Sequence, residues 1–419
     1  METVKKIKDR LLSRFPALKH QNFRRFLAGQ SVSLIGTWMQ RAAQQWVVYQ
    51  LTKSPLILGL VGVCQFTPML LFSLFAGVLV DRFPKKPFLM VTQSLQMLQA
   101  FILAALLWSG RIEYWHILIL AGFLGLANTF DMPTRQSFFI ELVGKEDLVS
   151  AIGLNSSIVN LARIIGPALA GLFLSCFGAV ACFLFNGLSF ITVLIGLFFI
   201  QSYSVTIRMK SQNVFEDIVD GLKYLFSIRI LADTIIVFLI VGTIAMNSDV
   251  LVPVFAKETF HQGAGGYSLM LSAMGIGSLV GSLWFAGRKK TEFGGDNLFY
   301  KAIMLSVFLI VTGMMHSYYL TLFSLAGVGL CSMIFMATVN STIQLNTDDS
   351  YRGRTVSVYT LVMNGTTPIG NLGTGLINQN FGPEISFLVC GFLTLVLVSV
   401  LFLTKHKSLI MTKMIKPSR

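Results

Sequence analysis

Long apolar segments alternate with short polar ones along the whole chain. Twelve apolar segments are each long enough, at about 20 residues, for a helix to cross the hydrocarbon core of a bilayer. They begin near residues 26, 56, 87, 115, 148, 180, 230, 267, 298, 318, 355 and 386. Because these segments are continuously apolar rather than alternating, they disfavour the strands of a transmembrane barrel. The pattern predicts an all-α membrane protein with twelve transmembrane helices.

A polar stripe runs along the first of these segments. At the 100° step of an α-helix, its polar residues share an arc of roughly 140°. They are Gln30, Ser33, Thr37, Gln40, Arg41, Gln44 and Gln45. Hydrocarbon cannot satisfy such a stripe, so it must face a wet cavity or polar neighbours. We expect it to line a substrate or proton pathway; the alternative is hydrogen bonding between helices without transport.

Two further segments carry a polar face at helical spacing. In the fifth it comprises Ser156, Asn160, Arg163 and Pro167, and in the eleventh Thr360, Asn364, Thr367 and Asn371. Arg163 is the one charged member of either set, and an arginine near the middle of a span costs at least a few kcal/mol unless it is paired or hydrated. We expect Asn160, Arg163, Asn364 and Thr367 to lie on the pathway, with a structural role for Arg163 as the alternative.

The two halves of the chain repeat each other at an offset of 204 residues. The segments AGLFLSCFG at 170–178 and TGLINQNFG at 374–382 match at four positions, and Lys85-Lys86 corresponds to Lys289-Lys290. Six spans return each half to its starting side, so the repeat predicts two pseudo-symmetric, parallel six-helix bundles, as in rocking transporters. The expected domains are residues 1–201, a cytoplasmic linker helix at 202–229, and residues 230–419.

Asp249 is the clearest acid inside a predicted span. The repeat makes it the counterpart of Gln45, one helical turn outward of Arg41. Our hypothesis is that Arg41 and Asp249 meet when the outer side is closed, and separate, or Asp249 takes up a proton, when it opens. A carboxyl that alternates between a cation and a low-dielectric pocket changes its proton affinity, as proton coupling requires. A static ion pair is the alternative, and Pro253 is expected to bend this helix.

The basic charge of the chain follows its topology. The net charge is +14, but 28 of the 33 Lys and Arg residues lie at the termini or in loops after even-numbered spans. Only Lys53, Arg111 and Lys257 lie in loops on the other side. This positive-inside distribution places both termini in the cytoplasm and removes the need for a nucleic-acid partner. With 54% hydrophobic and 12% charged residues, the chain has too little polar surface for a soluble protein.

Several kinds of chemistry lack a sequence signature. The five cysteines have neither metal nor redox spacing, and no phosphate-binding loop is present, so we expect no metal, cofactor or nucleotide motor. A membrane-embedded lipid-modifying enzyme is a remote alternative, because the expected cytoplasmic acids are scattered without a nucleophile. Those acids are Asp131, Glu141, Glu146 and Asp147. An uptake transporter or uniporter for a metabolite is the closer alternative, and the duplicated halves disfavour a channel.

Five segments together resemble a known transporter family. The stretch GVLVDRFPKK at 77–86 resembles motif A of the major facilitator superfamily, between the second and third spans. Residues 22–60, 132–143, 161–171 and 352–361 are similar to its enterobactin-exporter-like branch. The resemblance implies a twelve-span secondary transporter, of a kind that exports drugs or siderophores against inward proton flow.

The resemblance also assigns residues. It gives Gly77, Asp81, Arg82 and Lys86 the motif A role of a cytoplasmic latch, with Arg352 and Arg354 at the start of the eleventh span. An acid placed there can accept hydrogen bonds from the first amides of a neighbouring helix. Gly166, Pro167 and Gly171 resemble the antiporter motif of the fifth span, although Ala162 and Ala170 replace glycines of the strict pattern.

The combined prediction is a secondary exporter in the inner membrane of a bacterium. It would move a small siderophore-like or drug-like molecule by alternating access, in exchange for protons, as a monomer. Two arginines and one carboxylate on the expected pathway favour anionic, phenolic or carboxylate-bearing substrates.

Overall fold

A computed structural model describes residues 15–200, 214–287, 296–348 and 351–415. Among these residues it contains helices and no strand, so the all-α prediction is confirmed. Ten helices are long and apolar enough to cross a membrane, within the described residues. The first helix, Gln21–Thr52, is not among the ten, because its polar stripe lowers its hydropathy. The last of the ten, Arg354–Lys405, contains two spans that are divided at Gly382. The helices therefore provide twelve spans, as predicted.

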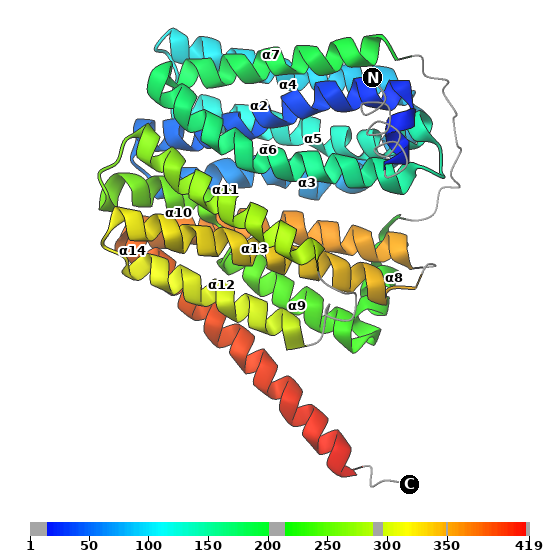
Figure 1. The fold of residues 1–419 in the computed structure, drawn as a ribbon, viewed down its shortest axis with the longest axis vertical. Helices are drawn as coiled ribbons and strands as arrows, with labels where there is room; N and C mark the ends of the chain where they lie inside the picture. The colour runs from blue at the N-terminus through cyan, green and yellow to red at the C-terminus, as the bar shows by residue number, and fades with distance from the viewer. Residues whose placement is uncertain (1–14, 201–213, 288–295, 349–350, 416–419) are drawn as a thin grey trace, which may run out of the picture. The chain divides into compact units, whose positions relative to one another are not determined.

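The helices form two compact units. The N-terminal unit contains the described residues up to Lys53 and those from Cys64 to Ile200. Its elements are η1 (Pro16–Lys19), α2 (Gln21–Thr52), most of α3 (Pro55–Arg82), α4 (Lys85–Trp108), α5 (Tyr114–Val143), α6 (Leu148–Cys176) and α7 (Gly178–Phe198). Figure 1 shows them as long helices in blue to green.

The C-terminal unit contains Ser54–Val63, at the start of α3, and the described residues from Val214 onward. Its other elements are α8 (Val214–Ser227), α9 (Arg229–Ile244), α10 (Ser248–Val254), η2 (Phe255–Thr259), α11 (Ala264–Ala286), α12 (Asp296–Met314), α13 (Tyr318–Asn346) and α14 (Arg352–Ile415). At Gly382, φ is 82° and ψ is 169°, which divides α14 into two helical rods. Glycine suits this position because a side chain strains a positive φ.

The seventh span is interrupted, although not by its proline. Helix α9 ends at Ile244, and α10 begins at Ser248 and continues through Pro253 into the π-helical turn η2. At the interruption, Asn247 Nδ2 donates hydrogen bonds to the carbonyl oxygens of Thr243 at 2.8 Å and Ile244 at 3.2 Å. This side-chain amide satisfies carbonyls at the end of α9, so the helix can stop inside the bundle.

Aromatic packing holds one end of the N-terminal unit together. Phe23 and Phe26 of α2 are buried against Phe138 and Phe139 of α5, with ring centroids 5.7–5.9 Å apart and ring planes close to perpendicular. Edge-to-face aromatic pairs contribute about 0.5–1.5 kcal/mol each beyond their buried area.

The short helix α8 packs on the start of α14 within the C-terminal unit. The rings of Tyr224 and Tyr351 stack at 4.1 Å, and Arg354 pairs with Asp220 at 3.7 Å. A Cβ at Gly221 would lie 3.1 Å from the Arg354 side chain, so the small residue allows this close approach.

Candidate substrate and proton pathway

Two arginines predicted to line the pathway meet on one aromatic ring in the N-terminal unit. The guanidinium carbon of Arg41, on α2, lies 5.2 Å from the ring centroid of Trp38, and that of Arg163, on α6, lies 5.0 Å from it. Arg41 also lies 6.0 Å from the ring of Phe66 on α3. A tryptophan face attracts cations by about 0.5–2 kcal/mol, so one residue accommodates both charges.

Gly166 allows α6 to reach this ring. A Cβ at that position would lie 2.5 Å from Trp38 Cβ, closer than side chains tolerate. Both arginines take part in further interactions, so neither charge depends on this ring alone. The ring of Trp38 therefore brings guanidinium groups from α2 and α6 into one region of the N-terminal unit.

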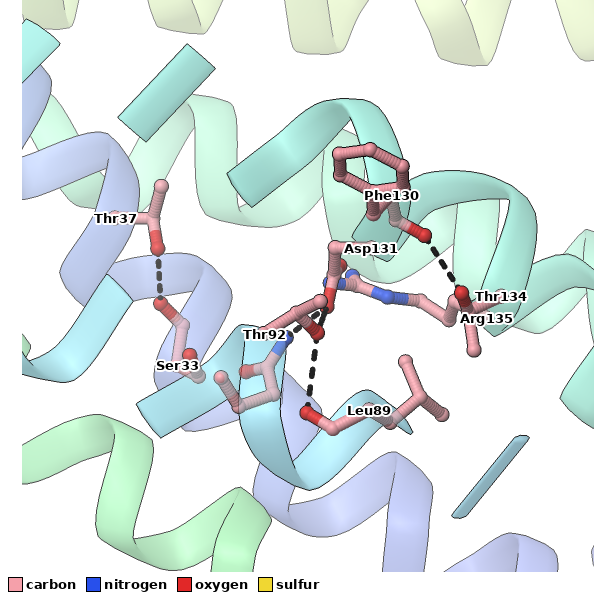
Figure 2. Close-up of polar contacts among 9 residues, drawn as sticks. Ser33, Thr37, Leu89, Thr92, Phe130, Asp131, Thr134 and Arg135 are labelled. Carbon is pink, nitrogen blue, oxygen red and sulfur yellow. Dashed lines mark hydrogen bonds and ion pairs between the residues drawn. The ribbon is translucent and has the colours of Figure 1, made fainter. Parts of the chain in front are cut away.

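The polar stripe of α2 does not face a cavity along its whole length. Gln40 is 3% exposed and donates a hydrogen bond from Nε2 to Gln99 Oε1 on α4 at 3.0 Å. It accepts one at Oε1 from Asn186 Nδ2 on α7 at 2.8 Å. Gln40 therefore connects three helices, as the alternative interpretation of the stripe requires. Gln30, Gln44 and Gln45 are also buried, and Thr37 bonds to the carbonyl of Ser33 in its own helix (Figure 2).

Asp131 lies elsewhere than the sequence analysis placed it. We expected Asp131 among scattered cytoplasmic acids, but it lies within α5 and is 2% exposed. At 1.5 Å per residue it is about 25 Å from the first residue of α5 and about 18 Å from the last. The apolar run of α5 ends just before Asp131, whereas the helix continues to Val143. Hydropathy alone would therefore end this helix too early.

Asp131 is the centre of a polar cluster between α4 and α5, shown in Figure 2. Its Oδ1 accepts hydrogen bonds from Thr92 Oγ1 at 2.8 Å and from Gln93 Nε2 at 2.6 Å. Its Oδ2 pairs with Arg135, four residues later on the same helix. Two sequence signals would have identified the cluster. One is the Asp-x-x-x-Arg spacing, and the other is the polar series Thr92, Gln93, Gln96 and Gln99 in an apolar helix.

In the C-terminal unit, the predicted pathway residues lie near the interrupted seventh span and on α14. Asp249 is half-buried in the first turn of α10. On α14, Asn364 is buried, and Thr367 Oγ1 donates to the carbonyl of Met363 at 3.2 Å. A Cβ at Gly370 would lie 2.5 Å from Asn247 Oδ1, so α14 packs directly against the interruption. The pairing of Asp249 with Arg41 stays a prediction.

Comparison with known proteins identifies the family. The family model described as transmembrane secretion effector, within the major facilitator superfamily, matches residues 12–416. The chain belongs to this family. The predicted resemblance to the major facilitator superfamily is thereby confirmed, and the protein is a multi-pass membrane transporter.

The relatives of this transporter align over most of its length. It is 25% identical to the staphyloferrin A transporter of Staphylococcus aureus, over 91% of this chain and 96% of that one. It is 22% identical to macrolide efflux protein A of Streptococcus pyogenes, over 89% and 93%. It is 24% identical to the multidrug efflux pump Tap of Mycolicibacterium fortuitum, over 91% and 94%.

Solved structures agree on the fold. The nucleoside transporter NupG aligns with a TM-score of 0.73 at 11% identity, over 91% of this chain and 98% of that one. A bacterial homologue of the iron transporter ferroportin, in an inward-facing state, aligns with a TM-score of 0.67 at 15% identity, over 92% and 98%. At these identities the likeness concerns the fold alone, which is that of a major facilitator transporter.

The motif A residues of this transporter are described in part. Gly77 and the side chains of Asp81, Arg82 and Arg352 lie outside the residues described in full. Lys86 Nζ donates to the carbonyl oxygens of Phe198 at 3.2 Å and Ile200 at 2.7 Å, at the end of α7. A lysine there satisfies helix-terminal carbonyls and the negative end of the helix dipole. Arg354 pairs with Asp220 of the linker helix.

The antiporter-like residues Gly166, Pro167 and Gly171 are all buried in α6. The helix continues through Pro167 despite the missing amide donor. Of the three, Gly166 has a defined packing role, because it brings α6 against the Trp38 that carries both arginines.

Proposed function

We propose that this transporter exports a small organic molecule, siderophore-like or drug-like, across the cytoplasmic membrane of a bacterium. The observation that carries the proposal is the match to a secretion family over residues 12–416. Relatives that align over 89–91% of the chain are named for the efflux of macrolides and other drugs and for the transport of staphyloferrin A. The distribution of Lys and Arg supports cytoplasmic termini, and the proposed working unit is the monomer.

The proposed mechanism is alternating access between two six-helix halves, residues 1–201 and 230–419, joined by the linker at 202–229. The proposed pathway combines polar residues from both halves. They are Gln30, Thr37, Arg41, Gln44, Gln45, Asn160, Arg163, Asp249, Asn364 and Thr367. The two arginines on Trp38 support a preference for substrates that carry a carboxylate or phenolate.

The proposed driving force is inward proton flow, with Asp249 as a proton-binding group. Its half-buried position beside the interrupted helix supports this role, because helix interruptions in transporters coincide with binding sites. Protonation of Asp249 would remove a negative charge from the pathway and change its balance with Arg41 and Arg163.

Transport by purified protein in liposomes tests the proposal. With a pH gradient imposed, the protein is expected to move at least one compound from a panel of staphyloferrin A, erythromycin and ethidium in the export direction. Asp249→Asn is expected to reduce gradient-driven transport at least about fivefold, as the loss of a coupling energy of about 1–3 kcal/mol implies. Transport in the uptake direction would contradict export, and full gradient-driven transport by the variant would remove Asp249 from the coupling mechanism.

A second expectation concerns the motif A latch of Gly77, Asp81, Arg82 and Lys86. We infer that Asp81 accepts hydrogen bonds from the first amides of the eleventh span in one state of the cycle. Asp81→Asn is expected to shift the transporter toward the form that is open to the cytoplasm and to reduce transport. Cysteine labelling from each side of the membrane measures this shift. Unchanged labelling and transport in a correctly inserted variant would show that Asp81 only balances the neighbouring bases.

A further inference from the structure

The cluster around Asp131 places a full ion pair inside the N-terminal unit. The Asp131 side chain is 3% exposed and that of Arg135 is 17% exposed. Ionisable residues within membrane helices are rare and cost several kcal/mol even when they are partly compensated. The ion pair lies within α5, so it does not join α5 to α4. Packing between the two helices therefore does not account for both charges.

Two buried polar atoms of this cluster have no hydrogen-bond partner. Gln93 uses its Nε2 on the carboxylate, while its Oε1 is buried and has no hydrogen-bond partner. Arg135 Nε is also buried without a partner. Buried polar atoms of this kind are uncommon and call for an explanation. An unused acceptor beside a carboxylate suits the protonated acid, whose O–H requires an acceptor.

The same glutamine can serve both protonation states. A carboxylate accepts a hydrogen bond from Gln93 Nε2, as observed. A carboxylic acid can donate to Gln93 Oε1 after the amide rotates by half a turn, because the two ends of an amide are nearly equal in shape. Thr92 Oγ1 can remain in place, since a hydroxyl both donates and accepts.

Polar side chains continue from this cluster along α4 to α2. Gln93, Gln96 and Gln99 follow one another along α4, and Gln99 reaches Gln40 on α2. Besides Gln93 Oε1, two further buried polar atoms lie along this path without a partner, Gln96 Nε2 and Gln99 Nε2. At 1.5 Å per residue, the path from Gln93 to Gln99 rises about 9 Å. It connects the buried acid with the polar stripe of α2.

Other charges on the helices around α5 have different partners. Arg24 and Arg25 on α2, and Lys85 and Lys86 on α4, donate to backbone carbonyls. Arg41 on α2 and Arg163 on α6 lie over Trp38. On α5 itself, Glu141 is ten residues from Asp131, about 15 Å along the helix. Within the described residues, Arg135 is the charged group in contact with Asp131.

We propose that Asp131 is a proton-binding residue of the transport cycle, in addition to Asp249; the coupling role rests on the proposed proton-driven export. A proton taken up from the aqueous phase forms an O–H bond at Oδ1, where Gln93 Oε1 can accept it. The carboxyl group loses its negative charge, so the ion pair between Oδ2 and Arg135 breaks. The net charge of the pair changes from zero to +1. Arg135, which stays protonated, then requires a new acceptor, and this requirement connects proton binding to a rearrangement of α4 and α5.

Infrared difference spectroscopy of the purified protein tests proton binding without a substrate. Acidification is expected to produce a carboxylic acid C=O band in the wild type that is absent from Asp131→Asn and present in Asp147→Asn. Asp147 is a matched control, because it is a partly exposed acid that pairs with His20 at 2.8 Å. A band in Asp131→Asn identical to that of the wild type would overturn the proposal.

Liposome transport then tests coupling, with whichever of staphyloferrin A, erythromycin and ethidium the wild type moves. Asp131→Asn is expected to reduce gradient-driven transport at least about fivefold, while exchange of labelled for unlabelled probe without a gradient persists. Undiminished gradient-driven transport would overturn the coupling role. If the single variant does not fold, Asp131→Asn combined with Arg135→Gln removes both charges and is measured in its place. Failure of the wild type to move any probe would count against export and leave the infrared result to decide proton binding.

Discussion

Gly277→Leu is expected to prevent stable folding of the C-terminal unit. A Cβ at Gly277, on α11, would overlap the carbonyl oxygen of Ala326 on α13. Gly329 on α13 makes the reciprocal approach to the carbonyl oxygen of Met274 on α11, so the backbones themselves are in contact. Neither helix can give way without separating the pair. Close packing drives helix association in membranes, so the expected loss is about 3 kcal/mol or more.

Size-exclusion profiles and melting temperatures in detergent measure this effect. The variant is expected to give little monodisperse protein and a clearly lower melting temperature. Gly153→Leu, on α6, is a matched control because no heavy atom lies within 4 Å of a Cβ built there. Its profile is expected to match that of the wild type. A Gly277→Leu protein as stable as the wild type would mean that α11 and α13 do not pack this closely.

Lys405→Met is expected to destabilise the same unit through charge. Lys405 is 12% exposed, and its Nζ lies 3.3 Å from both Asp233 on α9 and Asp296 on α12. Without the lysine, two carboxylates would face each other, and the Asp233 carboxylate would lose its counter-ion. Leaving a partly buried charge without its partner costs about 1–3 kcal/mol. The melting temperature in detergent is therefore expected to fall by several degrees.

A second substitution separates charge from packing. Adding Asp233→Asn to Lys405→Met removes one of the two opposed acids and is expected to recover part of the lost stability. Lys223→Met, at an exposed position on α8, is the matched control and is expected to have little effect. If the double variant is no more stable than Lys405→Met, the stabilisation comes from contacts of the lysine chain, such as its position 5.0 Å from the Phe299 ring, rather than from its charge.

The fold was largely predictable because hydrocarbon imposes a strict length on each span. Twelve apolar runs, a repeat at an offset of 204 and the family resemblance sufficed to predict the architecture. The predicted ends of the helices were less accurate where a helix extends beyond its apolar run. Asp131 shows this, because an acid that follows an apolar run looks like the start of a loop, whereas its buried partners Thr92, Gln93 and Arg135 retain it within α5.

The interruption of the seventh span could not be predicted from the sequence. Pro253 was the expected point of bending, and the helix changes to a π-helical turn at Phe255. The interruption itself lies earlier, at Asn247. A proline affects a helix through its missing amide, which neighbouring structure can compensate. An asparagine ends a helix when its side chain takes over backbone carbonyls, and this depends on the space left by Gly370 on α14. Such space is a property of the packed bundle.

The sequence by itself determined the class of protein, its spans and repeat, and the polar residues that do not belong in lipid. Periodicity places a side chain on one face of one helix, so it could select Arg41, Arg163 and Gln40. Only the tertiary structure decided their partners. It places both arginines on Trp38, and it joins Gln40 to Gln99 and Asn186. Whether a buried polar group binds a neighbour or faces a pathway depends on which other helix lies opposite, and residues far apart in the chain determine that.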